Sequence, residues 1–214
     1  MQWLTRFTEL VEDWSYLSRR DGWRATLPLI GQEAARLPYR RLRFAVPARS
    51  LLEPLPDLQP KIALEIRVFQ PADLALVRQI NRPSEAGLYQ RRLARGHMGL
   101  IAFHDGQPAG YAWACPEIDP GLERAYWKLE SGDVFCVDAY TAPAFRGYGI
   151  QTALTLARFR LFRDLGYQRA IAYIEVHNHP SLAVWNKFGS QIIGYIDFMR
   201  LGPWRRTHVS GLAS

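Results

Sequence analysis

The sequence predicts a mixed α/β domain that begins near residue 64 and is preceded by a helical extension. From residue 64 onward, strand-like and helix-like segments follow one another in the order β-α-α-β-β-β-α-β-α-β. One of these strands leads through a glycine loop directly into a helix. The chain has 214 residues, of which 48% are hydrophobic and 22% charged, so it is long enough to bury the core of one such domain with an appendage.

The first 63 residues form a separate extension in this interpretation. Apolar and aromatic residues recur at helical spacing from Trp3 to Leu17, and a second helical pattern covers residues 24–37. Residues 41–46 alternate like a strand, and a proline-rich linker follows. The aromatic stripe of the first helix is expected to pack on the following domain or on a second subunit, so a homodimer is one arrangement that it allows.

The domain, residues 64–214, contains the remaining elements. Strand-like patterns cover residues 64–69, 98–103, 107–115, 133–141, 170–176 and 191–199. Helical spacing of apolar residues covers residues 71–80, 82–96, 150–165 and 180–188. Asp105-Gly106 is typical of a tight hairpin turn between the second and third strands, and residues 116–131 are expected to form a loop.

The glycine loop joins the strand that ends at Thr141 to the helix that begins at Ile150, through Arg146-Gly147-Tyr148-Gly149. The first turn of a helix has amides without intrahelical partners and a partial positive charge, and glycines let a ligand approach the backbone closely. The segment therefore predicts a phosphate-binding loop. It lacks the Lys-Ser/Thr of a P-loop and the third glycine of a dinucleotide fingerprint.

A second motif begins the last helix and reads Asn178-His-Pro-Ser181-Leu-Ala-Val-Trp185-Asn-Lys187-Phe-Gly189. Asn178 is of a type favoured as a helix N-cap. Lys187 suits the negative end of the helix dipole, and Gly189 suits the position just past the helix end.

The two motifs resemble those of the GNAT superfamily of N-acetyltransferases, over about 150 residues from Leu64 to the C-terminus. The family's loop motif is Gln/Arg-x-x-Gly-x-Gly/Ala, which Arg146 and Gly149 match and Gln151 does not. The family's second motif is Asn-x-x-Ala/Ser-x-x-x-Tyr-x-Lys-x-Gly-Phe, which is matched by Asn178, Ser181, Lys187 and Gly189. The resemblance implies a mixed, mostly antiparallel central sheet flanked by helices, and direct transfer of an acetyl group from acetyl-CoA to a primary amine in a ternary complex.

The resemblance also implies how acetyl-CoA is held. Its pantetheine arm is expected along the backbone of Ala139, Tyr140 and Thr141 and against the side chain of Asn178, with Ser181 at the matching position beside it. Its pyrophosphate is expected against Arg146 and the amides of Gly147, Tyr148, Gly149, Ile150, Gln151 and Thr152.

The catalytic groups are less well defined. Trp185 stands where the family has a tyrosine, the presumed acid for the leaving thiolate, and an indole N–H cannot serve as that acid. Water, another residue or release of the thiolate itself would then replace the tyrosine. The base that takes the amine proton has three main candidates, Asp133, Asp138 and Glu175, and His177 is a weaker fourth. Asp133 matches the base of the histone-acetylating members, and a strand points it away from Asp138 unless there is a bulge.

The acceptor site is predicted from aromatic residues. A flat apolar wall for a small-molecule or peptide amine is expected from Tyr111, Trp113, Trp127 and Tyr140, although such residues are as easily part of the core. Trp185 is expected at the same site, where it would shape the pocket beside the thiol.

Composition limits the other functions. The net charge of +7 suits an anionic cofactor, and no nucleic-acid-binding motif accompanies it. Cys115 and Cys136 lie outside any metal-type spacing, so buried thiols and no metal site are expected. No uncharged apolar run is long enough for a membrane span, and a cytoplasmic location is expected. The rival function is a non-catalytic acyl-CoA-binding sensor or scaffold.

Overall fold

The computed structural model describes residues 39–117, 127–201 and 204–211. The helices expected within residues 1–38, and most of the loop expected over residues 116–131, lie outside the described residues. Within the described ranges, no helix is long and apolar enough to cross a membrane.

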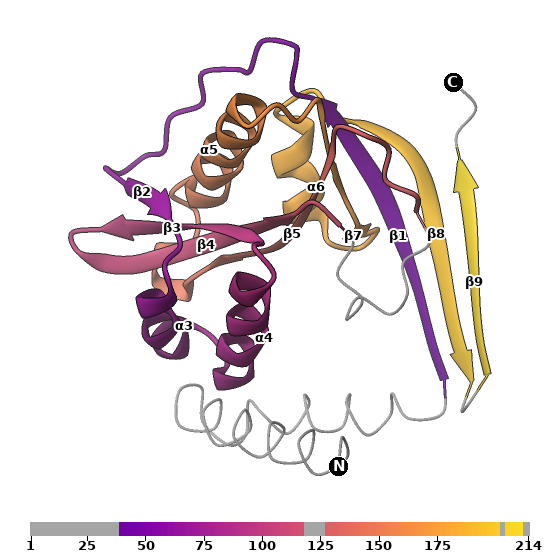
Figure 1. Cartoon of the computed structure of the whole chain (residues 1–214), viewed down its shortest axis with the longest axis horizontal. Coiled ribbons are helices and arrows are strands. Elements are labelled where there is room, and N and C mark those ends of the chain that lie inside the picture. Colours follow the sequence, from indigo (N-terminus) through magenta and orange to yellow (C-terminus); the bar gives the residue numbers. More distant parts are fainter. Residues whose placement is uncertain (1–38, 118–126, 202–203, 212–214) are drawn as a thin grey trace.

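A nine-stranded sheet runs through the described part of the chain (Figure 1). Among the described residues, β5 and β6 pair in parallel and the other pairings are antiparallel, which confirms the mixed, mostly antiparallel sheet. In spatial order the strands are β2 (Glu65–Val68), β3 (Met98–His104), β4 (Gln107–Cys115), β5 (Asp133–Thr141), β6 (Arg169–Ala172), β1 (Tyr39–Ser50), β8 (Gln191–Leu201) and β9 (Trp204–Gly211), with β7 (Ile174–Glu175) beside β1.

Helices cover both faces of the sheet around β3, β4 and β5 (Figure 1). On one face lie α3 (Leu74–Ile80), which the short 3-10 helix η1 (Pro71–Asp73) precedes, and α4 (Pro83–Ala94). On the other face lie α5 (Ile150–Asp164), which the 3-10 helix η2 (Pro143–Phe145) and the glycine loop precede, and α6 (His179–Asn186).

The core is divided by the sheet in the same way. Phe69, Tyr89 and Trp113 are buried together on the face of α3 and α4. Leu100 and Leu154 belong to the cluster under α5. Both cysteines are buried thiols on the neighbouring strands β4 and β5, as expected from their apolar surroundings.

Strand β1 corrects the interpretation of the N-terminal extension. The sequence places residues 41–46 before the domain, but β1 lies inside the sheet between β6 and β8. Phe44 pairs with Ile196 on β8, and Val46 is fully buried. The register with β8 shifts at Pro47, which has no N–H to donate to the ladder. Pairing between such distant segments leaves no local signal, so hydrophobic alternation alone cannot assign this strand to the sheet.

Two further elements differ from the sequence-based expectation. The strand expected over residues 170–176 is divided at Tyr173, because β6 pairs with both β5 and β1 whereas β7 pairs with β1. Strand β9 has no counterpart in the expectation, since its sequence is mostly polar and it pairs along β8 as the last strand of the sheet path. The remaining bounds agree to within two residues when η1 is counted as the first turn of the helix expected over residues 71–80.

Candidate active site

The sheet opens between β5 and β7. Parallel pairing of β5 with β6 runs from Asp133 opposite Arg169 to Cys136 opposite Ala172. Beyond that point β7 pairs with β1 instead. Within the described residues, 137–141 of β5 therefore have no strand partner on this side, and their backbone groups are available to another molecule.

A β-bulge in β5 lies at the start of this opening. Tyr140 pairs with Tyr111 and Val137 with Trp113, so two residues of β5 lie opposite one residue of β4. Asp138, one of the two, has a φ of 44°, in the left-handed region that few non-glycine residues adopt. The bulge lets the Asp138 carboxylate form an ion pair with Arg92 of α4. From the sequence, Asp133 and Asp138 are expected to point to opposite sides of the strand unless a bulge separates them. The structure contains such a bulge.

The glycine loop meets the helix as the sequence predicts. Gly147 and Gly149 have φ values of 84° and 86°, and Gly149 is the N-cap of α5. The amide of Ala153 donates to the carbonyl of Gly149 at 3.0 Å, which is the first bond of the helix ladder. The amides of residues 150–152 therefore have no intrahelical acceptor and lie at the positive end of the helix dipole.

Polar side chains near this loop have unused hydrogen-bonding capacity. The Thr141 hydroxyl and both polar atoms of the Gln151 amide are enclosed by protein and have no hydrogen-bond partner among the described residues. Arg146 is exposed, and its Nε donates to the carbonyl of Thr141 at 3.4 Å. Buried polar groups without partners are costly, so this set fits an anionic or polar ligand that would supply them.

The proline-rich linker lies against the loop. The Lys61 amide donates to the Tyr148 carbonyl at 2.9 Å, and a Cβ on Gly149 would lie 3.4 Å from the Cα of Pro60. A cavity of about 500 Å³ lies between linker residues 58–64 and the face of α5. The absence of a side chain at Gly149 thus lets the linker pack closely against the glycine loop, in addition to any role in ligand binding.

The motif at α6 forms the helix cap expected from its residue types. The Asn178 Oδ1 accepts a hydrogen bond from the Ser181 amide at 3.2 Å, so Asn178 is the N-cap. Gly189 has a φ of 70° and donates from its amide to the Asn186 carbonyl at 3.0 Å, as a residue just past a helix end does. The contact of Asn178 with pantetheine stays a prediction.

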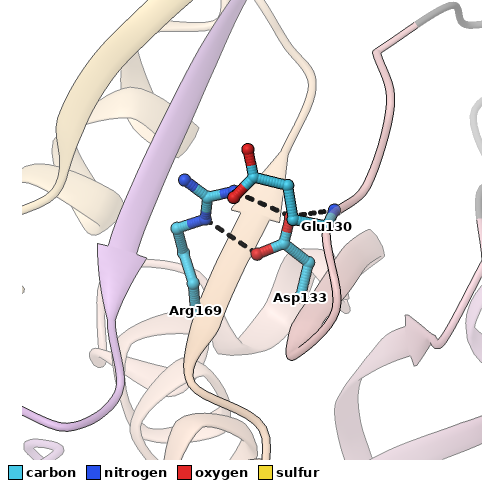
Figure 2. A network of polar contacts seen from close by, with 3 residues as sticks. All are labelled: Glu130, Asp133 and Arg169. Carbon is cyan, nitrogen blue, oxygen red and sulfur yellow. Dashed lines mark hydrogen bonds and ion pairs between the residues drawn. The ribbon is translucent and has the colours of Figure 1, made fainter. Parts of the chain in front are cut away.

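Asp133 is held in a polar network (Figure 2). Its Oδ1 accepts from the Arg169 Nε at 2.7 Å, and its Oδ2 accepts from the Arg169 Nη2 at 2.9 Å and from the Glu130 amide at 2.8 Å. The Arg169 Nη2 also donates to a Glu130 carboxylate oxygen at 2.8 Å. With a side chain only 2% exposed, Asp133 anchors the start of β5 and is poorly placed to take a proton from a substrate.

The other two candidate bases lie on opposite sides of the opening. Asp138 is on β5, with 32% of its side chain exposed. Glu175 ends β7, is half-buried, and accepts at its backbone carbonyl from the Asn178 amide at 2.8 Å.

Three aromatic residues expected at the acceptor site, Tyr111, Trp113 and Trp185, are buried, which favours the alternative that they belong to the core. Trp185 is 4% exposed and packs edge-on against Phe159, with ring centres 5.3 Å apart. Trp113 is fully buried and stacks on Tyr89 at 5.0 Å. Tyr111 is also fully buried. These rings serve the core because they lie on strand and helix faces that pack against other elements.

The sequence interpretation misses a polar network on the face of α3 and α4. The Tyr111 hydroxyl accepts from the Asn81 side-chain amide and lies 3.1 Å from the Tyr89 hydroxyl. Tyr89 in turn hydrogen-bonds Glu85. Burial is the main cause that raises the pKa of Tyr89 and of Tyr111, so both remain protonated donors. One sequence pattern could have predicted this network. Residues 85, 89 and 92 all carry polar groups and are spaced four and three apart, which places them on one face of a helix.

Comparisons with known proteins give a consistent picture. Residues 67–190 match the family model described as the acetyltransferase (GNAT) family. A mycothiol acetyltransferase from Saccharomonospora viridis is 30% identical over 89 residues, which cover 42% of this chain and 28% of that protein. The chain therefore spans less than a third of this curated relative's length.

Solved structures resemble the fold. A Drosophila protein aligns with a TM-score of 0.57 at 17% identity, covering 84% of this chain and 58% of its own. A GCN5-related N-acetyltransferase from Sphaerobacter thermophilus aligns with a TM-score of 0.54 at 16% identity, covering 88% of this chain and 58% of its own. At these identities the likeness concerns the fold alone.

Proposed function

This chain belongs to the GNAT family of acetyltransferases, and from that premise we propose that it transfers an acetyl group from acetyl-CoA to a primary amine. The observation that carries the proposal is the opening of the sheet beside the glycine loop and the start of α5. The acceptor is a small-molecule or peptide amine, and both substrates bind before transfer occurs.

The proposed cofactor site uses groups that the fold leaves without partners. The pyrophosphate would accept hydrogen bonds from the amides of residues 150–152 and from the glycine loop, with Arg146 supplying positive charge. The pantetheine arm would lie along the unpaired edge of β5 at residues 139–141, with Asn178 across the opening. The partnerless Thr141 hydroxyl and Gln151 amide support this assignment.

The reaction is a direct displacement. The amine nitrogen attacks the thioester carbonyl, the C–N bond forms, the C–S bond breaks, and the electron pair leaves on the CoA sulfur. Backbone N–H groups of β5 would stabilise the developing oxyanion, and most of the acceleration would come from holding both substrates in reacting geometry. One proton leaves the amine and one is taken up by the thiolate. Of the three main candidate bases, Asp138 and Glu175 flank the opening, whereas Asp133 is engaged by Arg169.

One observation favours the rival function. Trp185 replaces the family's acidic tyrosine and is buried, so this position supplies no proton to the thiolate. A protein that binds acyl-CoA without turnover, as a sensor or scaffold, would need no such acid.

Two isosteric variants at Gly147 test the cofactor site. A Cβ on Gly147 has no atom within 4 Å, whereas a change at Gly149 would press on Pro60. Gly147→Asp and Gly147→Asn share the same backbone strain and differ by one negative charge. We expect calorimetry to show acetyl-CoA binding about 10- to 100-fold weaker for the aspartate variant than for the asparagine variant, because the charge lies beside the pyrophosphate.

Equal affinities in two folded variants would contradict the assignment of the pyrophosphate site.

A thiol-release assay with a panel of primary amines distinguishes the transferase from the non-catalytic sensor or scaffold. Amine-dependent release of CoA supports the transferase, and tight binding of acetyl-CoA without release supports the sensor.

A further inference from the structure

Three side chains form a row on the face of α4 that packs against β4 and β5. Glu85, Tyr89 and Arg92 are spaced four and three residues apart, so they lie on one side of the helix. Tyr89 is 1% exposed and Arg92 2%, whereas Glu85 is partly exposed. Arg92 crosses to β5 to pair with Asp138 at the bulge. The row thus ends at the point where the sheet opens.

Contacts of aromatic rings and hydroxyl groups hold this row against β4 and β5. The Tyr89 ring lies edge-on to Tyr111 with centres 5.2 Å apart, and Tyr111 stacks on Tyr140 at 5.5 Å. The Tyr140 hydroxyl donates to the Ile80 carbonyl at the end of α3 at 2.7 Å. Tyr89 joins this layer to the Glu85 carboxylate. A carboxylate held by such a network has a defined position relative to β5.

The surroundings of Glu85 favour its protonated form. Burial raises the pKa of its carboxyl group, and the negative charge of Asp138 raises that pKa further. The hydrogen bond from Tyr89 and the positive charges of Arg82 and Arg92 act in the opposite direction without reversing the shift. A carboxylate with a raised pKa is a stronger base near neutral pH than an exposed glutamate.

We propose that Glu85 contacts the acceptor amine and takes its proton, directly or through one water, while Asp138 and Arg92 form a positioning pair. The proposal rests on the proposed transferase function and selects a group outside the candidates that the sequence suggests. The proton passes from the amine nitrogen to a Glu85 oxygen, and the nitrogen lone pair forms the new bond to the acetyl carbon. The CoA sulfur keeps the electrons of the broken C–S bond.

The two faces of the sheet support this division of roles. The glycine loop and α5 lie on one face, and α3 and α4 lie on the other (Figure 1). Acetyl-CoA held at α5 would therefore meet an acceptor that approaches along α4. Asp138 is less suited to act as the base itself, because its carboxylate is engaged in an ion pair with Arg92.

The kinetic test compares Glu85→Gln, Glu85→Asp and the control Glu65→Gln. Glu65 is exposed on β2, outside this row. Thiol release is measured from roughly pH 5 to 9 with spermidine, glucosamine and trialanine as probes. We expect Glu85→Gln to lower kcat about 10²- to 10⁴-fold with an unchanged KM for acetyl-CoA, Glu85→Asp to recover part of the loss, and Glu65→Gln to match the wild type.

The pH profile identifies the group. Glu85 acts only when deprotonated, so kcat should fall on the acid side of its pKa, and Glu85→Gln should remove that acid limb. Asp138→Asn removes a negative charge that raises the pKa of Glu85, so the limb should move to lower pH. A Glu85→Gln variant within about threefold of the wild type, with the same profile, overturns the proposal.

A second measurement separates this inference from the proposed function. The carbon signal of the Glu85 side-chain carboxylate is assigned by its loss in Glu85→Gln, and the three amines are added with acetyl-CoA absent. A shift of this signal, with the Glu65 signal unchanged, supports an amine site at Glu85. An unshifted Glu85 signal overturns that site even if CoA is released, whereas acetyl-CoA binding without release for any amine overturns the transferase function instead.

Discussion

The position of Trp185 in the second motif can be recognised from the sequence, but the surroundings of its side chain cannot. The sequence indicates that a tryptophan stands where the family has an acidic tyrosine. It does not indicate that the ring packs into the core beside Phe159 and Phe188, because that packing depends on how α6 lies on α5. The buried ring makes a structural role the stronger expectation.

Substitutions of Trp185 separate packing from proton transfer. We expect Trp185→Phe to lower the free energy of unfolding by about 1–3 kcal/mol, since a smaller ring leaves part of the site empty, and to keep most of the activity. Trp185→Tyr should gain less than about tenfold in thiol release, below the range for a well-placed general acid. A hundredfold gain would instead indicate a protein that has lost its enzymatic step.

Asp133 offers a second test at the same scale. We expect Asp133→Asn to lower the free energy of unfolding by about 1–3 kcal/mol, because its partner Arg169 is partly exposed and loses two charged contacts. Urea unfolding measures this change. Glu130→Gln, at an exposed carboxylate of the same network, should cost less than about 1 kcal/mol.

The alternative role of Asp133 predicts the reverse pattern. If Asp133 were the base, Asp133→Asn would abolish thiol release while the unfolding curve stayed nearly unchanged. Retained activity in the folded fraction would assign Asp133 to structure.

At the scale of elements, local periodicity predicts most of what is observed. The helix α5 follows from apolar residues three to four apart and a glycine before Ile150, and β5 follows from its β-rich run up to Thr141. The features that shape the site are those without periodicity. The bulge at Asp138 places a non-glycine residue at positive φ, and the break at Tyr173 interrupts an apolar run that continues in sequence. Both depend on partners in other strands.

The network around Glu85 is hidden for a related reason. A single glutamate on a helix is most often a solvated side chain, and the role proposed for Glu85 depends on Asp138 and Tyr111 on two different strands. The glycine loop could be recognised because its proposed function depends on consecutive backbone groups. The proposed acceptor side could not, because its residues come from α3, α4, β4 and β5.

At the scale of the whole molecule, β1 joins described segments that lie far apart in the sequence into one sheet. It pairs with β8 from Tyr39 opposite Leu201 to Ala48 opposite Gln191, and with β6 and β7 on its other edge. The linker that follows β1 then contacts the glycine loop through the Lys61 amide. Residues assigned by sequence to an extension therefore contribute to the sheet and to the surroundings of the proposed cofactor site, while the boundary at residue 63 stays a prediction.

Truncation measures how much the molecule depends on this strand. Deleting residues 1–60 removes β1 and leaves the facing edges of β6 and β8 without partners, together with the apolar surface that Val46 and Ala48 cover. Exposed sheet edges and apolar surface favour aggregation. We therefore expect this truncation to be insoluble or to melt well below the full chain. A matched deletion of residues 1–38 keeps β1. The difference in solubility and melting temperature between the two truncated proteins therefore reports on the strand and linker alone. Equal solubility and melting temperature in the two truncations would mean that the sheet closes without β1, and that residues 39–60 act only as a tether.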